Sequence, residues 1–93
     1  MRLLLVEDDI MVASGIKLGL TDAGYAADWV GSGERAEEVL QSETFDVAVV
    51  DIGLPGMDGL ELTRRLRRPE MASHDMPVLI LTARDALHDR VQG

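Results

Sequence analysis

Three apolar runs of this 93-residue chain are each followed by side chains that could do chemistry. The runs are residues 3–6, 47–50 and 78–81, and each is short, uninterrupted and rich in Val, Leu or Ile. Such runs are typical of strands buried on both faces of a parallel sheet. The polar residues that follow them are Glu7, Asp8, Asp9, Asp51 and Thr82. Because ligands bind outside the carboxyl ends of parallel strands, these residues are candidates for a functional site.

Carboxylates gathered at neighbouring strand ends repel one another, so a protein that holds them together does so around a cation. Oxygen ligands without sulfur or imidazole favour a hard ion, and a sparse site that keeps its waters favours Mg²⁺ over Ca²⁺. A carboxylate beside Mg²⁺, such as that of Asp51, can attack phosphorus, and the hydroxyl of Thr82 can bond a phosphoryl oxygen. The alternative is a solvated acidic rim without a metal, in which Asp51 is only a turn residue. The residues alone leave both interpretations open.

Alternating strand and helix patterns indicate how these residues are positioned. We expect strands at 3–6, 25–30, 45–51 and 77–81, and helices at 10–23, 34–42, 58–68 and 84–92. A strand–helix unit repeated four times predicts an α/β fold, a parallel sheet with helices on both faces. Right-handed crossovers and a split around the first strand predict the flavodoxin-like order 2-1-3-4, with the strand of lower hydrophobicity at 25–30 on an edge.

Several local signals set the expected ends and faces of these elements. The buried side of the first helix is expected to consist of apolar residues four apart, Val12, Ile16 and Leu20. Gly24 is a good C-terminal stop for that helix. Asp58 and Glu61 have the spacing of a capping box. Trp29 is expected to be packed or half-exposed at the sheet edge, and strand 77–81 is expected to be buried.

Composition excludes several classes of protein. A hydrophobic content of 46% argues against disorder, and the absence of cysteine excludes disulfides and thiolate metal sites, which fits a reducing compartment. A net charge of −8 argues against direct nucleic acid binding by this segment. No apolar run approaches the roughly 20 residues of a membrane span, and the apolar amino terminus is too soon followed by acids to be a signal peptide.

Three motifs in order closely resemble the receiver domain of bacterial two-component response regulators. They are VEDD at 6–9, VVD at 49–51 with LPGMDG at 54–59, and LTAR at 81–84. The residues of the second and third motifs are similar to those of the family branch that carries a winged-helix DNA-binding domain after the receiver. The resemblance implies a cytoplasmic phosphorelay protein that controls a transcriptional output domain and binds DNA only through that domain.

The resemblance also implies roles for individual residues. Asp51 would accept a phosphoryl group from a phosphohistidine of a sensor histidine kinase, and Thr82 would be the switch hydroxyl. Asp8 and Asp51 would ligate Mg²⁺ directly, Glu7 would do so through water, and Gly53 would offer its backbone carbonyl. The chain would be a phospho-acceptor and not an enzyme, apart from slow self-catalysed phosphorylation and dephosphorylation.

The sequence departs from the family beyond its fourth strand. Family members continue into a fifth strand and helix that carry an aromatic switch residue and a lysine for the phosphoryl group. This sequence stops at Gly93, and its one lysine, Lys17, lies in the first helix. We therefore expect residues 1–93 to form an incomplete receiver with an exposed fourth-strand edge. A chain ending there is expected to self-associate through that edge.

Two other interpretations compete with phosphotransfer. The first is a receiver-fold interaction module that works without phosphorylation. The second is a dinucleotide-binding half-domain, because residues 31–36 fit the pattern G-x-G-x-x-G/A between a strand and a helix. A haloacid-dehalogenase-like phosphotransferase is disfavoured because it needs a second acid two residues after Asp51, where Gly53 stands. His74 and His88 lack partners at metal-ligand spacing and are expected on the surface.

Overall fold

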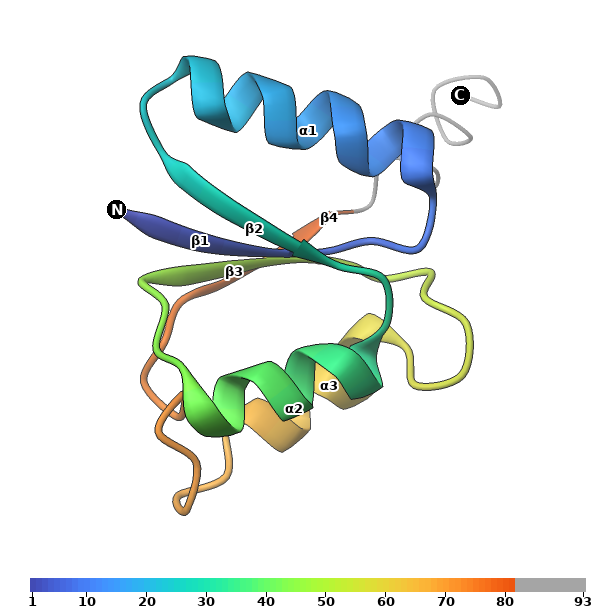
Figure 1. Ribbon diagram of the computed structural model, residues 1–93. Coiled ribbons are helices and arrows are strands. Elements are labelled where there is room, and N and C mark those ends of the chain that lie inside the picture. The colour runs from blue at the N-terminus through green and yellow to red at the C-terminus, as the bar shows by residue number, and fades with distance from the viewer. Residues whose placement is uncertain (82–93) are drawn as a thin grey trace, which may run out of the picture.

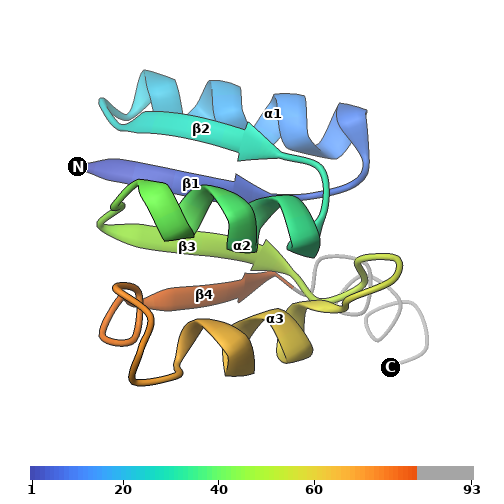
Figure 2. The same cartoon turned by 60° about the horizontal axis from the view of Figure 1, so that its bottom comes forward.

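The computed structural model describes residues 1–81, which form a four-stranded parallel sheet in the order β2-β1-β3-β4. The strands are β1 (Arg2–Val6), β2 (Ala26–Val30), β3 (Val47–Asp51) and β4 (Val78–Leu81), and the helices are α1 (Ile10–Asp22), α2 (Gly33–Ser42) and α3 (Gly59–Leu66). Helix α1 covers one face of the sheet, and α2 and α3 cover the other (Figure 1). Figure 2 shows the strands side by side in this order. The predicted flavodoxin-like α/β topology is confirmed.

The sheet is buried where its two central strands meet. Residues 3–6 of β1 and all of β3 are buried, whereas β2 is half-exposed along an edge. On the side of α2 and α3, Leu4, Val50 and Leu62 belong to one large apolar cluster. On the side of α1, a smaller cluster is formed by Leu5, Ala13 and Val49, with half-buried Ile16, Trp29 and Leu81 against it. The apolar runs at 3–6 and 47–50 therefore form the central strands, because each of these two runs has a helical layer on both sides.

The buried stripe of α1 differs from the prediction at its first position. Ala13 is fully buried and Ile16 and Leu20 are half-buried, but Val12 is 36% exposed. At about 100° per residue, each step of four residues advances roughly 40° around the helix, so a stripe continued from Leu20 through Ile16 drifts off the sheet at Val12. The face toward the sheet therefore runs through Ala13, and the assignment of Val12 to it was wrong.

Helix α3 ends earlier than predicted and uses only half of the expected capping box. Its last helical residue is Leu66 instead of Arg68, because Pro69 disfavours helical backbone at the residue before it. Asp58 caps the start by accepting from the backbone N–H of Glu61 at 2.9 Å. The Glu61 carboxylate forms ion pairs with Arg64 and Arg65 instead of reaching back to the cap. These two arginines lower the pKa of Glu61.

Strand β4 is less buried than predicted. Leu79 is 59% exposed, and the other residues of β4 are half-buried. The reason is its position, since β4 lies at the edge of the described sheet (Figure 2), whereas β1 and β3 each pair with two strands. The predicted helix 84–92, Thr82 and His88 lie outside the described residues. No helix within residues 1–81 is long and apolar enough to cross a membrane.

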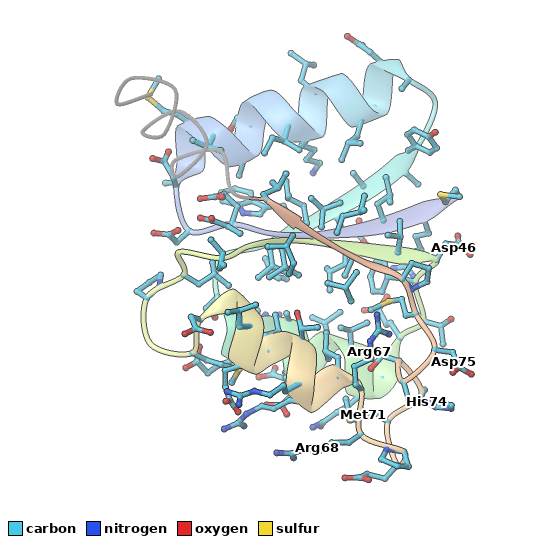
Figure 3. All side chains as sticks on the ribbon, turned by 180° about the vertical axis from the view of Figure 1, so that it is seen from behind. Asp46, Arg67, Arg68, Met71, His74 and Asp75 are labelled. Atoms are coloured by element: carbon cyan, nitrogen blue, oxygen red, sulfur yellow. The ribbon has the colours of Figure 1, made fainter. Side chains whose placement is uncertain are left out.

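The connection between α3 and β4 lies at the end of the molecule where the strands begin (Figure 3). The Arg67 guanidinium donates to the backbone carbonyls of His74 and Met76, so one side chain links the start of this connection to its end. Ser73 is buried and donates to the Leu66 carbonyl at 3.0 Å. Figure 3 shows that Arg67, His74 and Asp75 lie at the same end of the molecule as Asp46. This end is opposite the strand ends that carry the candidate site.

Candidate metal centre

Strands β1 and β3 deliver three carboxylates to one edge of the sheet. Glu7 follows the last residue of β1, Asp8 is next to it, and Asp51 is the last residue of β3. One carboxylate oxygen from each of these three residues lies within 4.8 Å of the other two. Glu7 is 2% exposed and Asp51 is 5% exposed, and Asp8 is the most exposed of the three. The structure thus brings together three of the predicted acids.

Asp9, the fourth acid named from the sequence, caps a helix. Its side chain accepts from the backbone N–H groups of Met11 and Val12, at 2.9 and 3.1 Å. Asp9 is therefore the N-cap of α1, and satisfies two donors that the helix itself leaves without partners. The cap fixes where α1 starts, and so fixes the length of the loop that carries Glu7 and Asp8.

Glu7 is the acid whose ionisation the fold changes most clearly. Burial, followed by its hydrogen bond with Asp51 and the charges of Asp51 and Asp8, raises the pKa of Glu7 to about 7. The backbone N–H of Asp9 donates to Glu7 Oε1 at 3.0 Å and opposes this rise. A buried carboxyl pressed against other carboxylates holds a proton or needs a cation, because its charged form is disfavoured on both counts.

The position of Asp51 depends on the loop that follows β3. Its Oδ1 accepts from the backbone N–H of Gly53 at 3.1 Å, so the chain turns back on the carboxylate directly. Further along, Gly59 begins α3 so close to β3 that an added Cβ would lie 2.6 Å from the Asp51 carbonyl oxygen. A glycine is required at this position because backbone atoms cannot move aside as a flexible side chain can. The sequence motif contained Gly59, but only the packing explains it.

The donor set fits a hard divalent cation. All three side chains offer oxygen, which is what Mg²⁺ prefers. One oxygen from each lies within 4.8 Å of the other two, close enough for a single hydrated cation to be shared among them. Gly53 lies beside the site, and Thr82 lies outside the described residues.

The glycine-rich turn 31–33 has a packing role. Ser32 caps α2 by accepting from the backbone N–H of Arg35 at 3.1 Å. An added Cβ at Gly33 would lie 3.1 Å from the Met57 carbonyl oxygen, so the loop between β3 and α3 presses on the start of α2. This contact accounts for the glycine of the dinucleotide-like pattern without a bound nucleotide.

Trp29 is a residue of the site that the sequence did not single out. It was expected only to be packed or half-exposed at the sheet edge, and it is half-buried. Its indole Nε1 also donates to the backbone carbonyl of Glu7 at 2.7 Å. No sequence pattern signals this contact, because Trp29 and Glu7 are 22 residues apart and meet only when β2 pairs with β1.

Comparison with known proteins agrees with this geometry. The response regulator receiver domain family matches residues 3–93. The chain is 46% identical to transcriptional regulatory protein QseB of Escherichia coli O157:H7 and 46% identical to response regulator protein PmrA of Pseudomonas aeruginosa, each over 93 residues. It spans 41% of the length of each of these relatives.

Solved structures show the same fold. One is the receiver domain of sensor histidine kinase PA1611 from Pseudomonas aeruginosa PAO1, which has a magnesium ion coordinated in its active-site cleft. It matches with a TM-score of 0.83 and 31% identity over 97% of this chain and 73% of its own. Another is a complex of histidine kinase ThkA with response regulator protein TrrA, with a TM-score of 0.79 and 32% identity over 88% of this chain and 68% of the matched chain.

Proposed function

Because this chain belongs to the response regulator receiver domain family, we propose that it accepts a phosphoryl group on Asp51 in an Mg²⁺-dependent phosphorelay. The observation that carries the proposal is the meeting of Glu7, Asp8 and Asp51 at one sheet edge, with their oxygens within 4.8 Å. Asp51 is the acceptor because it is buried at the carboxyl end of a central strand, where open α/β sheets bind ligands.

The proposed chemistry is the transfer of a phosphoryl group from an imidazole nitrogen to a carboxylate oxygen. An oxygen of the Asp51 carboxylate attacks phosphorus, and the bond between phosphorus and the imidazole nitrogen of a phosphohistidine breaks. The electron pair of that bond stays on the imidazole, and Asp51 becomes an acyl phosphate. A bound Mg²⁺ would neutralise charge on the transferring group.

Four groups of the chain are proposed to hold the ion. Asp8 and Asp51 ligate it directly, Glu7 through water, and Gly53 through its backbone carbonyl. The Glu7 carboxyl suits the outer position because it is the most deeply buried of the acids and already accepts from the Asp9 N–H. The hydroxyl of Thr82 is proposed to bond the phosphoryl oxygens and report phosphorylation.

The proposed donor of the phosphoryl group is a sensor histidine kinase, and the proposed output is a transcriptional DNA-binding domain. Relatives named as transcriptional regulators, and a similar response regulator solved with a histidine kinase, support both partners. The chain spans 41% of that first relative, and the proposed output domain would lie outside residues 1–93. A cytoplasmic location is part of the same proposal.

Intact-mass measurement tests the acceptor. The protein is incubated with a small-molecule phosphodonor, with and without Mg²⁺, and weighed. We expect one base-labile phosphoryl group that requires Mg²⁺ and is lost in Asp51→Asn, but is kept in Asp75→Asn, a matched change at an exposed aspartate. A folded wild-type protein that is never modified would contradict the proposal and favour an interaction module that works without phosphorylation.

Self-association through β4 is proposed for a chain that ends at Gly93. In the described sheet, β4 is an edge strand and carries the 59% exposed Leu79. An apolar edge with backbone groups available for pairing is a template for another strand. Sedimentation at micromolar concentration checks this proposal, and a single stable monomer would contradict it.

A further inference from the structure

Glu7 is held at three points, and two of them come from β2. Its backbone N–H donates to the Val30 carbonyl at 3.1 Å, and its backbone carbonyl accepts from the Trp29 indole at 2.7 Å. The third point is its carboxylate, which accepts from the Asp9 N–H at 3.0 Å. The orientation of Glu7 toward Asp8 and Asp51 thus depends on the neighbouring edge strand as well as on its own loop.

The Trp29 contact replaces a backbone hydrogen bond. Residues Leu5 and Val6 of β1 stand opposite Trp29 and Val30 of β2, and β2 ends at Val30. A longer β2 would supply the next backbone N–H to the Glu7 carbonyl, as a parallel ladder does. The chain turns at Gly31 instead, and the indole N–H reaches forward along the strand to the carbonyl. A buried carbonyl beyond the end of a ladder needs such a donor.

The indole rings of Trp29 are held by apolar packing in addition to the N–H hydrogen bond. Trp29 packs against the α1-side cluster of Leu5, Ala13 and Val49. Ala13 belongs to the helix that begins directly after the acidic loop, and Val49 lies two residues before Asp51 in β3. Trp29 therefore packs against an apolar cluster whose members come from α1, β1 and β3, the elements next to the three carboxylates.

We propose that Trp29 is a positioning residue of the metal centre: its indole N–H clamps the Glu7 carbonyl and so preorganises the carboxylates of Glu7 and Asp8 for a divalent cation. This inference rests on the proposed Mg²⁺ site. Without the clamp, the loop between β1 and α1 samples other conformations, and the cation must select the one that presents its ligands. Binding weakens by the fraction of time that the loop is correctly placed.

The sharpest test changes one atom of the indole. The chain contains a single tryptophan, so a tryptophan-requiring expression host replaces only Trp29 when it is fed an analogue. The benzothiophene analogue of tryptophan puts sulfur in place of the N–H and keeps the shape of the rings, which removes the donor and keeps the packing. Trp29→Phe is a second variant that loses the same donor. Ile16→Val, in the same apolar cluster, is the matched control for packing.

Mg²⁺ affinity, measured by calorimetry, is the first readout. We expect both Trp29 changes to raise the Kd for Mg²⁺ by about threefold to tenfold, the range expected for the loss of one neutral hydrogen bond. Ile16→Val should change the Kd by less than twofold even if it lowers Tm. Donor-free protein with a wild-type Kd would overturn the inference.

Hydrogen exchange in metal-free protein is the second readout, and it does not depend on metal binding or activity. In the wild type, we expect the Trp29 indole proton and the Asp9 amide proton to be protected. In Trp29→Phe, the Asp9 amide should exchange about threefold to tenfold faster, while amides in the centre of β3 keep their protection. Unchanged Asp9 exchange would show that the loop is held without the indole.

The two readouts separate this inference from the proposal on which it rests. If wild-type protein binds no Mg²⁺, the metal site itself is wrong, whatever the exchange data show. If the wild type binds Mg²⁺ and the donor-free protein binds equally well, only the role of Trp29 is wrong.

Discussion

The two ends of the parallel sheet treat carboxylates in opposite ways. At the amino ends, the Arg2 guanidinium forms ion pairs with Asp28 at 3.0 Å and with Glu43 at 2.6 Å. It also stacks over Phe45 at 4.2 Å, and the Arg2 backbone N–H donates to Asp46 at 2.6 Å. The pKa of Arg2 is raised by its hydrogen bonds to Glu43 and Asp28.

At the carboxyl ends, carboxylates lie against other carboxylates. Glu7, Asp8 and Asp51 meet within 4.8 Å, and their mutual proximity adds to burial in raising the pKa of Glu7 to about 7. At the amino ends, the fold supplies its own cation when it forms. At the carboxyl ends, it gathers negative charge that a proton or an added cation must neutralise. Within residues 1–81, the negative charge is therefore neutralised by a cation of the fold at the amino ends, whereas at the carboxyl ends the three acids lie close to one another.

The largest expected effect that separates the two ends is the pH dependence of the metal-free protein. The folded-state pKa of Glu7 is about 7, above its unfolded value of 4.5, so folded protein holds a proton that the unfolded chain releases. The contribution of Glu7 to stability is therefore full below about pH 4.5 and falls away as pH rises through about 7, by about 3 kcal/mol in total.

Chemical denaturation of wild type and Glu7→Gln without metal, from pH 5 to 8, checks this dependence of stability on pH. The side-chain amide of the Glu7→Gln variant keeps an oxygen that accepts from the Asp9 N–H, but it does not titrate. We expect the difference in unfolding free energy between the two proteins to change steadily across this range in favour of the variant. A difference that does not change with pH would show that Glu7 ionises normally in the folded protein.

The next largest effect is stabilisation by Mg²⁺. A cation that binds only the folded state adds about 1.4 kcal/mol when its concentration is ten times Kd. We expect Mg²⁺ at millimolar levels to raise Tm, Asp8→Asn to remove most of the rise, and Asp75→Asn to keep it. A wild-type Tm that does not respond to Mg²⁺ would contradict the proposed metal centre.

Removing a charge from the acidic end should stabilise the metal-free protein. Asp51→Asn keeps the size of the side chain and relieves repulsion with Glu7, which we expect to add about 1 kcal/mol to the free energy of unfolding. The measurement is denaturant unfolding in the presence of a chelator. A loss of stability would mean that the Asp51 charge is favourable in the fold even without metal.

The smallest expected effect has the opposite sign and lies at the amino ends. Arg2→Met keeps the apolar part of the side chain but removes the guanidinium from Asp28 and Glu43. Because these ion pairs are exposed and screened by water, we expect a modest fall in Tm, smaller than the Mg²⁺ effect and reduced in high salt. Arg68→Met, at an exposed arginine, is the control, and an equal effect in both variants would contradict a specific role for Arg2.

Within residues 1–81, local signals in the sequence predicted each helix and strand, with ends correct to within two residues. Gly24 ends α1 as expected: it adopts a positive φ of 94°, its N–H donates to the Thr21 carbonyl, and the Tyr25 N–H donates to the Leu20 carbonyl. These two bonds form the Schellman motif, a helix C-cap that depends only on residues close in the sequence. The predictions failed where burial depends on neighbours, as at Val12 on the margin of α1 and Leu79 on the edge strand.

The sequence by itself determined the strand order and the presence of acids at strand ends, because periodicity and connection rules act along the chain. The residue patterns did not separate Asp9 from the acids that meet; the family resemblance implied Glu7, Asp8 and Asp51, and the tertiary structure shows these three together. Asp9 follows Asp8 directly, yet it caps α1 while Asp8 joins Glu7 and Asp51. Only the tertiary structure placed the Trp29 indole on the Glu7 carbonyl. Both outcomes depend on strand pairing between distant segments, which fixes side-chain directions that no local pattern encodes.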